Sequence, residues 1–234
     1  MAEVKVLGTI ALKGVLMEYA PEFQEKTGHG IAPTWGPTGV VYDKCRTGEA
    51  FDVLIGVPEC IETMSAEGYA VAATQVDFTK SIVGVAVKKG TPHPKIDTVE
   101  DLKAALRAAK SVAYTDPATM AASGLYVAKL LEDWGMTEEV NAKAKFGRGG
   151  PVAEFLVTDE AEIALQQYCE HMLVPGVDVV GPVPDEIQKV STMSAALHTK
   201  APAAEAAKSL IAWLAAPETH EVLRRHGLFA PHEV

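Results

Sequence analysis

The sequence predicts an α/β fold in which strands and helices alternate along the chain. The spacing of hydrophobic residues switches repeatedly between a period of 2, typical of strands, and a period of 3.6, typical of helices. An uninterrupted apolar run at residues 82–87 is typical of a buried parallel strand. With 234 residues, the chain is long enough for one large domain or for two interlocked lobes.

The first half of the chain is predicted to begin with a strand and a long helix. Apolar residues recur at helical spacing from Leu12 to Phe23, Pro21 is expected to kink this helix, and Gly28 is expected to end it. Strands are predicted at residues 4–10, 31–35, 51–56 and 82–87, and shorter helices at 40–46 and 61–68.

The second half is predicted to form another α/β unit, and the last third of the chain to form two helices with few strands between them. Helices are expected at 98–109, 121–134, 152–157, 203–214 and around 222–225, and strands at 111–114, 140–146, 161–165 and 177–180. No repeat or low-complexity linker separates the halves. We therefore expect crossings near residues 78–82 and 187–192, with lobe 1 at 1–80 plus 190–234 and lobe 2 at 81–189.

Charge and composition argue against several classes of function. The formal net charge is −10, so the basic footprint that nucleic-acid binding needs is missing and no nucleic-acid partner is expected. Apolar stretches fall short of the roughly 20 residues that span a bilayer, so no direct membrane insertion is expected. Cys45, Cys60 and Cys169 lack a CxxC spacing and are interpreted as packing residues or exposed thiols, and neither a metal nor a cofactor is expected.

The N-terminal sequence MAEVKVLG lacks the basic segment and apolar segment of an export signal. Two interpretations stay open. The protein is cytoplasmic, or it is periplasmic and its export signal has been removed.

Loops of small residues occur in a particular order and spacing. They are GTIALKGVL (8–16), WGPTG (35–39), GEAFDVLIG (48–56), AYTDPATMAASGLY (113–126), GRGGPVAEFL (147–156) and EAEIALQQ (160–167). In these loops, residues 4–228 resemble the molybdate-binding family of solute-binding proteins, a branch of the type II periplasmic-binding-protein fold. The resemblance implies two α/β lobes, two interlobe crossings and a ligand cleft between the lobes.

Helix starts beyond the ends of strands are the ligand-binding positions that the resemblance implies. Free backbone N–H groups at such a start, with a small hydroxyl, can bind an anion without a charged side chain. A plain helix cap is the alternative interpretation of each loop. The candidate residues in these loops are Thr9, Ala11, Leu12, Thr38, Gly39, Ser123, Gly124, Gly149, Gly150 and Val152.

Two cationic residues flank the matched loops. Arg148 can meet a carboxylate with two parallel hydrogen bonds, and Lys80, which precedes Ser81, can meet one as a point charge. Surface charges at the mouth of the cleft are the alternative interpretation. We include all three residues among the candidate ligand contacts.

The chain departs from the family pattern in two loops. It has Thr9 and Ala11 where the molybdate binders carry a serine, and Gln167, with Gln166 beside it, where they present a tyrosine hydroxyl. Both glutamines are included among the candidate ligand contacts. We therefore favour an organic carboxylate over molybdate as the ligand.

The leading hypothesis is a solute-binding protein that holds a small anion, with a membrane permease as its partner if the chain is exported. The alternative is an isomerase of small polycarboxylates, because residues 176–188 (GVDVVGPVPDEIQ) resemble a related branch that includes enzymes similar to aconitate isomerase. An intracellular ligand sensor ranks last, because the sequence shows no DNA-binding appendage.

The isomerase alternative requires a base that moves an allylic proton and donors that stabilise the developing charge. The histidines lie outside the matched loops, and no spacing singles out Tyr114, Tyr168, Cys169 or Glu170 as the base. The sequence also lacks GxSxG, Walker, GxGxxG and HExxH motifs. It therefore leaves the catalytic residues of this alternative unassigned.

Overall fold

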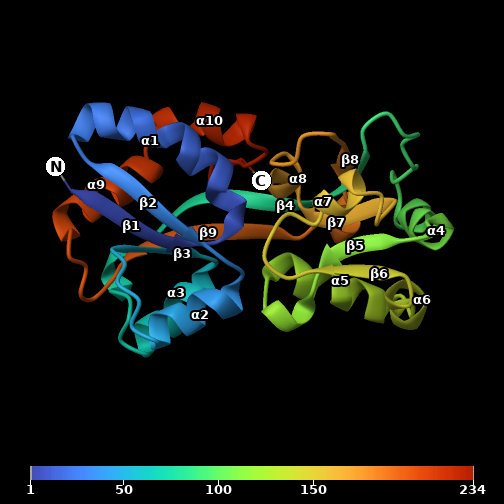
Figure 1. The fold of residues 1–234 in the computed structure, drawn as a ribbon, viewed down its shortest axis with the longest axis horizontal. Helices are drawn as coiled ribbons and strands as arrows, with labels where there is room; N and C mark the ends of the chain where they lie inside the picture. The colour runs from blue at the N-terminus through green and yellow to red at the C-terminus, as the bar shows by residue number, and fades with distance from the viewer. Residues whose placement is uncertain (1, 234) are drawn as a thin grey trace. The chain divides into compact units, whose positions relative to one another are not determined.

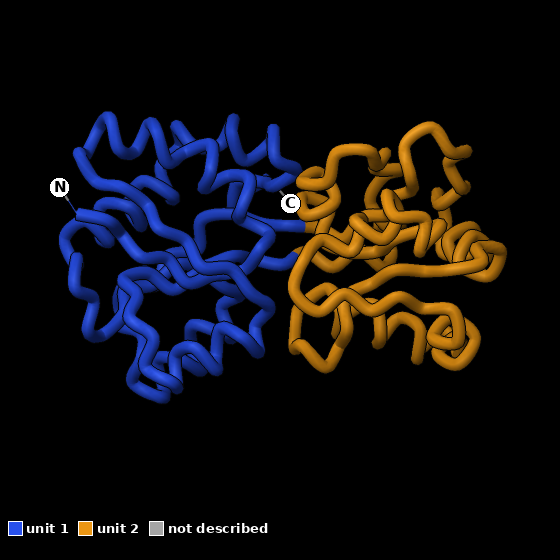
Figure 2. The backbone as a smooth tube through the Cα atoms, in the orientation of Figure 1, with its two compact units in different colours: residues 1–81, 191–234 blue, residues 82–190 orange. Residues whose placement is uncertain are grey.

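The computed structural model describes residues 2–233, and the chain divides into two compact units (Figure 2). Unit 1 comprises residues 1–81 and 191–234, and unit 2 comprises residues 82–190. The chain passes from one unit to the other within strand β4 (Val76–Lys88) and returns at the start of strand β9 (Val190–Leu197). Strands and helices alternate through both units, which confirms the predicted α/β class.

Unit 1 is built on a sheet in which β1 lies between β2 and β3. The strands are β1 (Glu3–Gly8), β2 (Gly30–Trp35) and β3 (Val53–Gly56). β1 pairs in parallel with both neighbours, and β9 pairs antiparallel with the outer side of β3. Because the three parallel strands run in the same direction, their carboxyl ends meet at one edge of the sheet.

Helices cover both faces of the unit 1 sheet (Figure 1). Buried Val15, Leu16, Tyr19 and Phe23 give the first helix its inner face, and Gly28 ends it with a φ of 73°, a conformation that glycine adopts without strain. This end confirms the predicted stop. The helices of unit 1 are α1 (Lys13–Thr27), α2 (Thr38–Arg46), α3 (Pro58–Ala66), α9 (Ala204–Leu214) and α10 (His220–Arg225), with 3₁₀ turns η1 (Ile10–Leu12), η2 (Ala72–Thr74) and η5 (Pro217–Thr219).

Unit 2 has a second mixed sheet. β5 (Val112–Thr115) pairs in parallel with β6 (Ala144–Gly147) on one side and with β7 (Ile163–Gln167) on the other. The second part of β4 pairs antiparallel with β7 and with β8 (Val177–Pro182). The parallel strands β5, β6 and β7 again bring their carboxyl ends to one edge.

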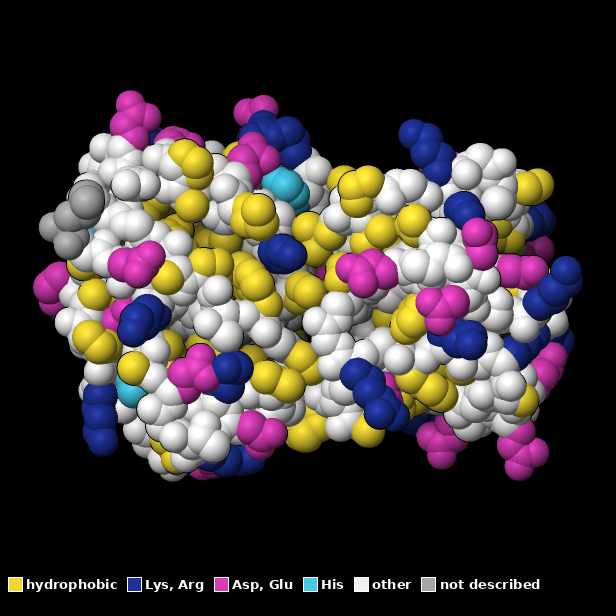
Figure 3. All heavy atoms as spheres, viewed as in Figure 1, with side chains coloured by type: hydrophobic (Ala, Val, Ile, Leu, Met, Phe, Trp, Pro, Cys, Tyr) yellow, Lys and Arg dark blue, Asp and Glu magenta, His cyan; other side chains and the backbone are white. Residues whose placement is uncertain are grey.

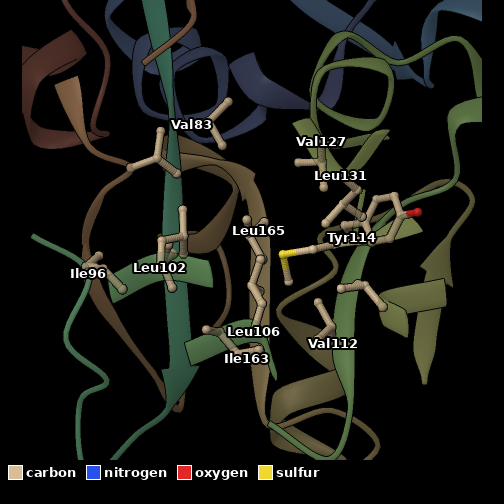
Figure 4. Packing of buried hydrophobic residues seen from close by; sticks show 14 residues of the cluster. Val83, Ile96, Leu102, Leu106, Val112, Tyr114, Val127, Leu131, Ile163 and Leu165 are labelled. Carbon is tan, nitrogen blue, oxygen red and sulfur yellow. The ribbon is translucent and has the colours of Figure 1, made fainter. Parts of the chain in front are cut away.

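The core of unit 2 is an apolar cluster between this sheet and its helices. Figure 4 shows Ile163 and Leu165 of β7 packed with Leu106 of α4 and with Val112 and Tyr114 of β5. These residues alternate along β5 and β7, because every second side chain of a strand faces the same side. The helices of unit 2 are α4 (Val99–Ala108), α5 (Ala122–Asp133), α6 (Thr137–Asn141), α7 (Glu154–Val157) and α8 (Tyr168–His171), with 3₁₀ turns η3 (Pro117–Thr119) and η4 (Asp185–Ile187).

Two secondary-structure predictions were wrong. Residues 140–146 were predicted as one strand, but Val140 lies in α6 and the strand β6 begins at Ala144. The buried Val140 side chain packs into the core from a helical turn. The alternation of apolar residues over 140–146 therefore does not reflect a continuous strand. The strand β9 was missed, because VSTMSAAL is rich in small polar residues and becomes a strand through its pairing with β3.

Candidate functional site

The carboxyl-end edge of the unit 1 sheet brings three of its loops together. After β1 comes Thr9, after β2 come Gly36 and Pro37, and after β3 comes Val57. The Gly36 N–H donates to the Gly8 carbonyl at 3.1 Å, and the Thr9 N–H donates to the Ile55 carbonyl at 3.3 Å. Backbone hydrogen bonds thus fix the two candidate loops at residues 9–12 and 36–39 to the ends of the central strands.

The start of α2 is one of the predicted anion-binding positions of unit 1. Pro37 is its N-cap, and the first helical bond runs from the Val41 N–H to the Pro37 carbonyl at 3.1 Å. The N–H groups of Thr38, Gly39 and Val40 precede this bond, so the helix itself supplies no acceptor for them. The first turn is uncharged and the last turn contains Lys44 and Arg46, so the helix dipole at the start faces no competing acidic side chain of its own turn.

Gly36 packs closely against the first turn of α2. A Cβ on Gly36 would lie 2.8 Å from the Cγ1 atom of Val40, closer than real Cβ contacts come. Pro37 makes no side-chain capping hydrogen bond, and half-buried Thr38 occupies the first helical position, where its hydroxyl is a candidate for ligand contact. The prediction that a helix starts at Thr38 and Gly39 is confirmed.

The loop at residues 9–12 is less open than the sequence suggested. The Thr9 hydroxyl accepts the Ala11 N–H at 3.5 Å, and the Thr9 carbonyl accepts the Leu12 N–H at 3.3 Å. Both bonds are long, and both Ala11 and Leu12 are buried. Their N–H groups are therefore partly used inside the loop, whereas the proton of the Thr9 hydroxyl stays available for donation.

The carboxyl-end edge of unit 2 places the start of α5 beside the end of β5. Ala121 is the N-cap of α5, so Ser123 and Gly124 fall in its first turn. Gly124 lies so close to β5 that an added Cβ would meet the Thr115 carbonyl oxygen at 2.6 Å. Ser123 is 4% exposed and lies in this first turn, so its hydroxyl is a candidate for ligand contact at this edge.

The glycine-rich loop of unit 2 corrects one predicted ligand contact. The Val152 N–H donates to the Gln166 side-chain oxygen at 2.7 Å, so this donor is not open to an anion. The Gln166 side-chain nitrogen donates to the Thr115 hydroxyl at 3.1 Å and to the Gly150 carbonyl at 3.4 Å. Gln166 therefore holds the loop in place, and α7 begins only at Glu154.

Arg148, in contrast, is accessible. Its side chain is 79% exposed, and its Nε donates to Asp116 Oδ2 at 2.9 Å. Gly149 has open space around it and Gly150 has only the Glu154 carboxylate nearby, as measured from an added Cβ to atoms of the described residues.

Lys80 and Ser81 do not flank a loop as predicted. Both lie inside β4, where the Lys80 N–H and carbonyl exchange hydrogen bonds with Phe229 at 2.8 and 2.9 Å, and Ser81 is fully buried. Gln167 is the last residue of β7 and is buried. Long-range pairing with the C-terminal segment, which local sequence does not reveal, fixed the position of Lys80.

Two buried titratable groups follow directly after β7. Burial raises the pKa of Glu170 to about 8 and lowers the pKa of His171 to about 4. Glu170 Oε2 and His171 Nδ1 have no hydrogen-bond partner among residues 2–233, whereas His171 Nε2 lies 3.1 Å from the Gly84 carbonyl. The sequence named Glu170 among several possible bases but gave no sign that its carboxyl group is buried.

The described residues also include cysteines, possible metal ligands and surface charges. All three cysteines are buried, and burial raises the pKa of Cys45 to about 11 and of Cys60 to about 12. In residues 2–233, no group of three His, Cys, Asp or Glu side chains is arranged to hold a metal ion, and no helix is long and apolar enough to cross a membrane. On the face in Figure 3, Lys and Arg side chains are interspersed with Asp and Glu.

The two sheets, with helix starts beyond the carboxyl ends of their parallel strands, define a protein of the periplasmic-binding type. The family described as bacterial extracellular solute-binding protein matches residues 4–229, and the chain belongs to this family. An aconitate isomerase from Pseudomonas sp. is 31% identical over 229 residues, which cover 95% of this chain and 86% of that protein. The molybdate-binding protein ModA of Azotobacter vinelandii is 28% identical over 236 residues, which cover 97% of this chain and 89% of that protein.

Solved structures agree with this assignment. The periplasmic molybdate-binding protein of Azotobacter vinelandii superimposes with a TM-score of 0.82 at 17% identity, covering 98% of this chain and 100% of the other. The sulfate-binding protein SubI of Mycobacterium tuberculosis gives a TM-score of 0.79 at 14% identity, covering 100% of this chain and 88% of the other. The predicted resemblance to the molybdate-binding-like family and its type II fold is confirmed.

Proposed function

We propose that this protein binds a small anion, either an organic carboxylate or an oxyanion, as the solute-binding protein of a transporter. The observation that carries the proposal is the start of α2. There the N–H groups of Thr38, Gly39 and Val40 precede the first helical hydrogen bond, and the turn that contains them is uncharged. Such a start binds anions through backbone donors and the helix dipole.

The edge of unit 2 supports the same proposal with side chains. The Ser123 hydroxyl lies in the first turn of α5, and Arg148 adds an exposed cation directly after β6. The relatives are named for aconitate, molybdate and sulfate, which are all anions. The helix starts of this chain and the names of these proteins therefore both favour an anion as the ligand.

A transport role implies a permease as the partner and the periplasm as the location of the mature chain. The family description as an extracellular solute-binding protein supports this location. Capture of a membrane permease by the tagged protein, in the presence of the bound anion, tests the partner.

An isomerase of small polycarboxylates is the second candidate. It is favoured by the relative that is 31% identical and is named an aconitate isomerase. Glu170 is the candidate base to test, because its buried Oε2 has no hydrogen-bond partner among residues 2–233 and burial raises its pKa to about 8. Moving a double bond in such a substrate requires the removal of one proton and the return of one proton at another carbon.

Thermal unfolding with a panel of anions tests the proposed function. The panel contains cis- and trans-aconitate, citrate, succinate, molybdate, tungstate and sulfate, with sodium chloride at equal ionic strength as the control. A ligand at 100 times its Kd adds about 2.7 kcal/mol to the free energy of unfolding, or roughly 5 to 10 °C for a chain of this size. If no anion raises the unfolding temperature above the chloride control, the proposed function is wrong.

The same samples separate the two candidates. Chromatography of cis-aconitate after incubation with the protein detects any trans-aconitate. Conversion above the protein-free rate establishes the isomerase, and its loss in a Glu170→Gln variant that still folds assigns a role to Glu170. Stabilisation by aconitate without conversion favours the binding protein.

A further inference from the structure

Arg148 is held by only one side of its guanidinium group. The Nε atom donates to Asp116 Oδ2 at 2.9 Å, and the two terminal nitrogens form no hydrogen bond within residues 2–233. Because the Arg148 side chain is 79% exposed, these terminal N–H groups are open to a ligand. The Asp116 side chain is only 13% exposed, so the pair has a fixed inner partner and an accessible outer partner.

The backbone N–H, the carbonyl and both carboxylate oxygens of Asp116 all form hydrogen bonds. Its Oδ1 accepts the Ala118 N–H at 2.9 Å, and its own N–H donates to the Gly147 carbonyl at 2.8 Å. Its carbonyl accepts the Thr119 N–H at 3.0 Å and the Thr119 hydroxyl at 2.7 Å. The carboxylate therefore offers Arg148 a rigid acceptor at the carboxyl end of β5.

The segment that carries Arg148 is also fixed at both of its ends. Gly147 pairs with Thr115 at the end of the β5–β6 ladder, and the Val152 N–H is bound to the Gln166 side chain at 2.7 Å. A side chain that starts from a fixed segment and binds a fixed carboxylate has few orientations left. Holding a binding group in this way lowers the entropy cost of ligand binding.

We propose that Asp116 orients Arg148 so that its two terminal nitrogens receive a carboxylate group of the ligand, and that this pair makes the site prefer carboxylates over tetrahedral oxyanions. The inference rests on the proposed anion-binding function and names the class of anion. A planar guanidinium edge matches the two oxygens of a planar carboxylate with two parallel hydrogen bonds. The Asp116–Arg148 pair carries no net charge, so it contributes matched geometry more than attraction for any compact anion.

Asp116 acts as a positioning residue in this arrangement. Both of its carboxylate oxygens already accept hydrogen bonds, from the Ala118 N–H and from Arg148 Nε.

Isothermal titration calorimetry with trans-aconitate and with molybdate tests the proposal on the full chain. The test variants are Asp116→Asn, which keeps an oxygen for the Ala118 N–H, and Arg148→Lys, which keeps the charge but loses the planar fork. The matched controls are Glu139→Gln and Arg107→Lys, because Arg107 Nε and Glu139 form an exposed pair in unit 2 at 3.4 Å. We expect each test variant to lower the ratio of aconitate affinity to molybdate affinity by roughly tenfold, and each control to leave this ratio unchanged.

The ratio separates orientation from simple charge. If Asp116 does not orient Arg148, removing its charge strengthens the binding of both anions alike and leaves the ratio constant. That result would overturn the proposal. In the Arg148→Lys background, Asp116→Asn is expected to have no further effect on the ratio, because the planar fork that Asp116 orients is already gone. A full additional loss in the double variant contradicts the positioning role.

The wild-type protein distinguishes failure of this inference from failure of the proposed function. If it binds molybdate but not aconitate, citrate or succinate, the carboxylate preference is wrong and the anion-binding function stands. If it binds none of these anions, the proposed function fails and the inference fails with it.

Discussion

The side-chain oxygen of Gln166 accepts the backbone N–H of Val152 at 2.7 Å, in a position where both residues are almost completely buried. The nitrogen of the same amide donates to the Thr115 hydroxyl at 3.1 Å. One side chain on β7 therefore joins the end of β5 to the glycine-rich loop. The loop that carries Arg148 owes its position to this amide.

Gln166→Leu is expected to lower the free energy of unfolding. The leucine fills a similar volume but leaves the Val152 N–H buried without an acceptor, which costs about 1 to 3 kcal/mol. Urea denaturation followed by circular dichroism measures the change. Gln24→Leu, at an exposed position on α1, is the control and is expected to stay within about 0.5 kcal/mol of the wild type. Equal losses in the two variants would contradict the role assigned to Gln166.

Gly124→Ala is expected to destabilise unit 2 through overpacking. The new methyl group would lie 2.6 Å from the Thr115 carbonyl oxygen, which belongs to a strand backbone and yields little. Overpacking of this kind costs about 1 to 3 kcal/mol, which lowers the unfolding temperature by roughly 2 to 12 °C. Gly30→Ala is the control, because a Cβ there meets no atom of residues 2–233 within 4 Å. An unfolding temperature that is unchanged in Gly124→Ala would show that α5 can move away from β5.

Glu170 is expected to make the protein less stable as the pH rises from about 6.5 to 8. Burial raises the pKa of Glu170 in the folded chain from its ordinary 4.5 to about 8, so in this range the folded chain binds a proton that the unfolded chain has released. The free energy of unfolding then falls by about 1.4 kcal/mol per pH unit. Glu170→Gln is expected to remove this slope in urea denaturation at several pH values.

His171 gives this pH profile a second limb. Burial lowers the pKa of His171 from 6.5 to about 4, so between these values the unfolded chain binds more protons and stability rises with pH. The opposing slope of Glu170 offsets this rise from about pH 4.5 upward. Glu139→Gln, at an exposed carboxylate, is the control. A slope above pH 6.5 that persists in Glu170→Gln would assign it to another group.

Thr38→Val is expected to weaken anion binding and to leave the fold intact. Valine keeps the shape of threonine but removes the hydroxyl at the first position of α2, so the loss is expected in ligand binding and amounts to about 1 kcal/mol of binding free energy. Calorimetric titration with the best anion of the panel measures it. Thr47→Val, at the other end of the same helix, is the control, since its hydroxyl binds the Asp43 carbonyl at 2.8 Å. If Thr38→Val and the wild type bind the anion with equal affinity, the Thr38 hydroxyl does not contact the ligand.

The start of α2 was predictable because its signals are local. Gly36 and Pro37 precede the helix directly, and the N–H groups of the first turn lack acceptors in any helix. The same holds for the end of α1, where Gly28 takes a positive φ that glycine tolerates. Chain neighbours alone decide such positions.

The partners of Gln166 and Arg148 were not predictable in this way. The sequence placed both residues among the ligand contacts, but Gln166 binds Val152, 14 residues away, and Thr115, 51 residues away. Arg148 binds Asp116, 32 residues away, and Asp116 was not among the candidates. These amide and guanidinium groups meet their partners because β5, β6 and β7 pair side by side. A single sequence does not show which strands pair.

The sequence by itself determined the alternation of strands and helices, the main helix starts and the small uncharged residues at those starts, because backbone preferences and hydrophobic period act over a few neighbouring residues. Only the tertiary structure decided which donors stay open. Parallel pairing of β5, β6 and β7 brings Thr115, Gly147 and Gln167 to one edge, where Gln166 takes up the Val152 N–H and Asp116 leaves the outer edge of Arg148 exposed. Hydrogen bonds between distant segments thus decide which of the candidate groups proposed by the sequence remain accessible.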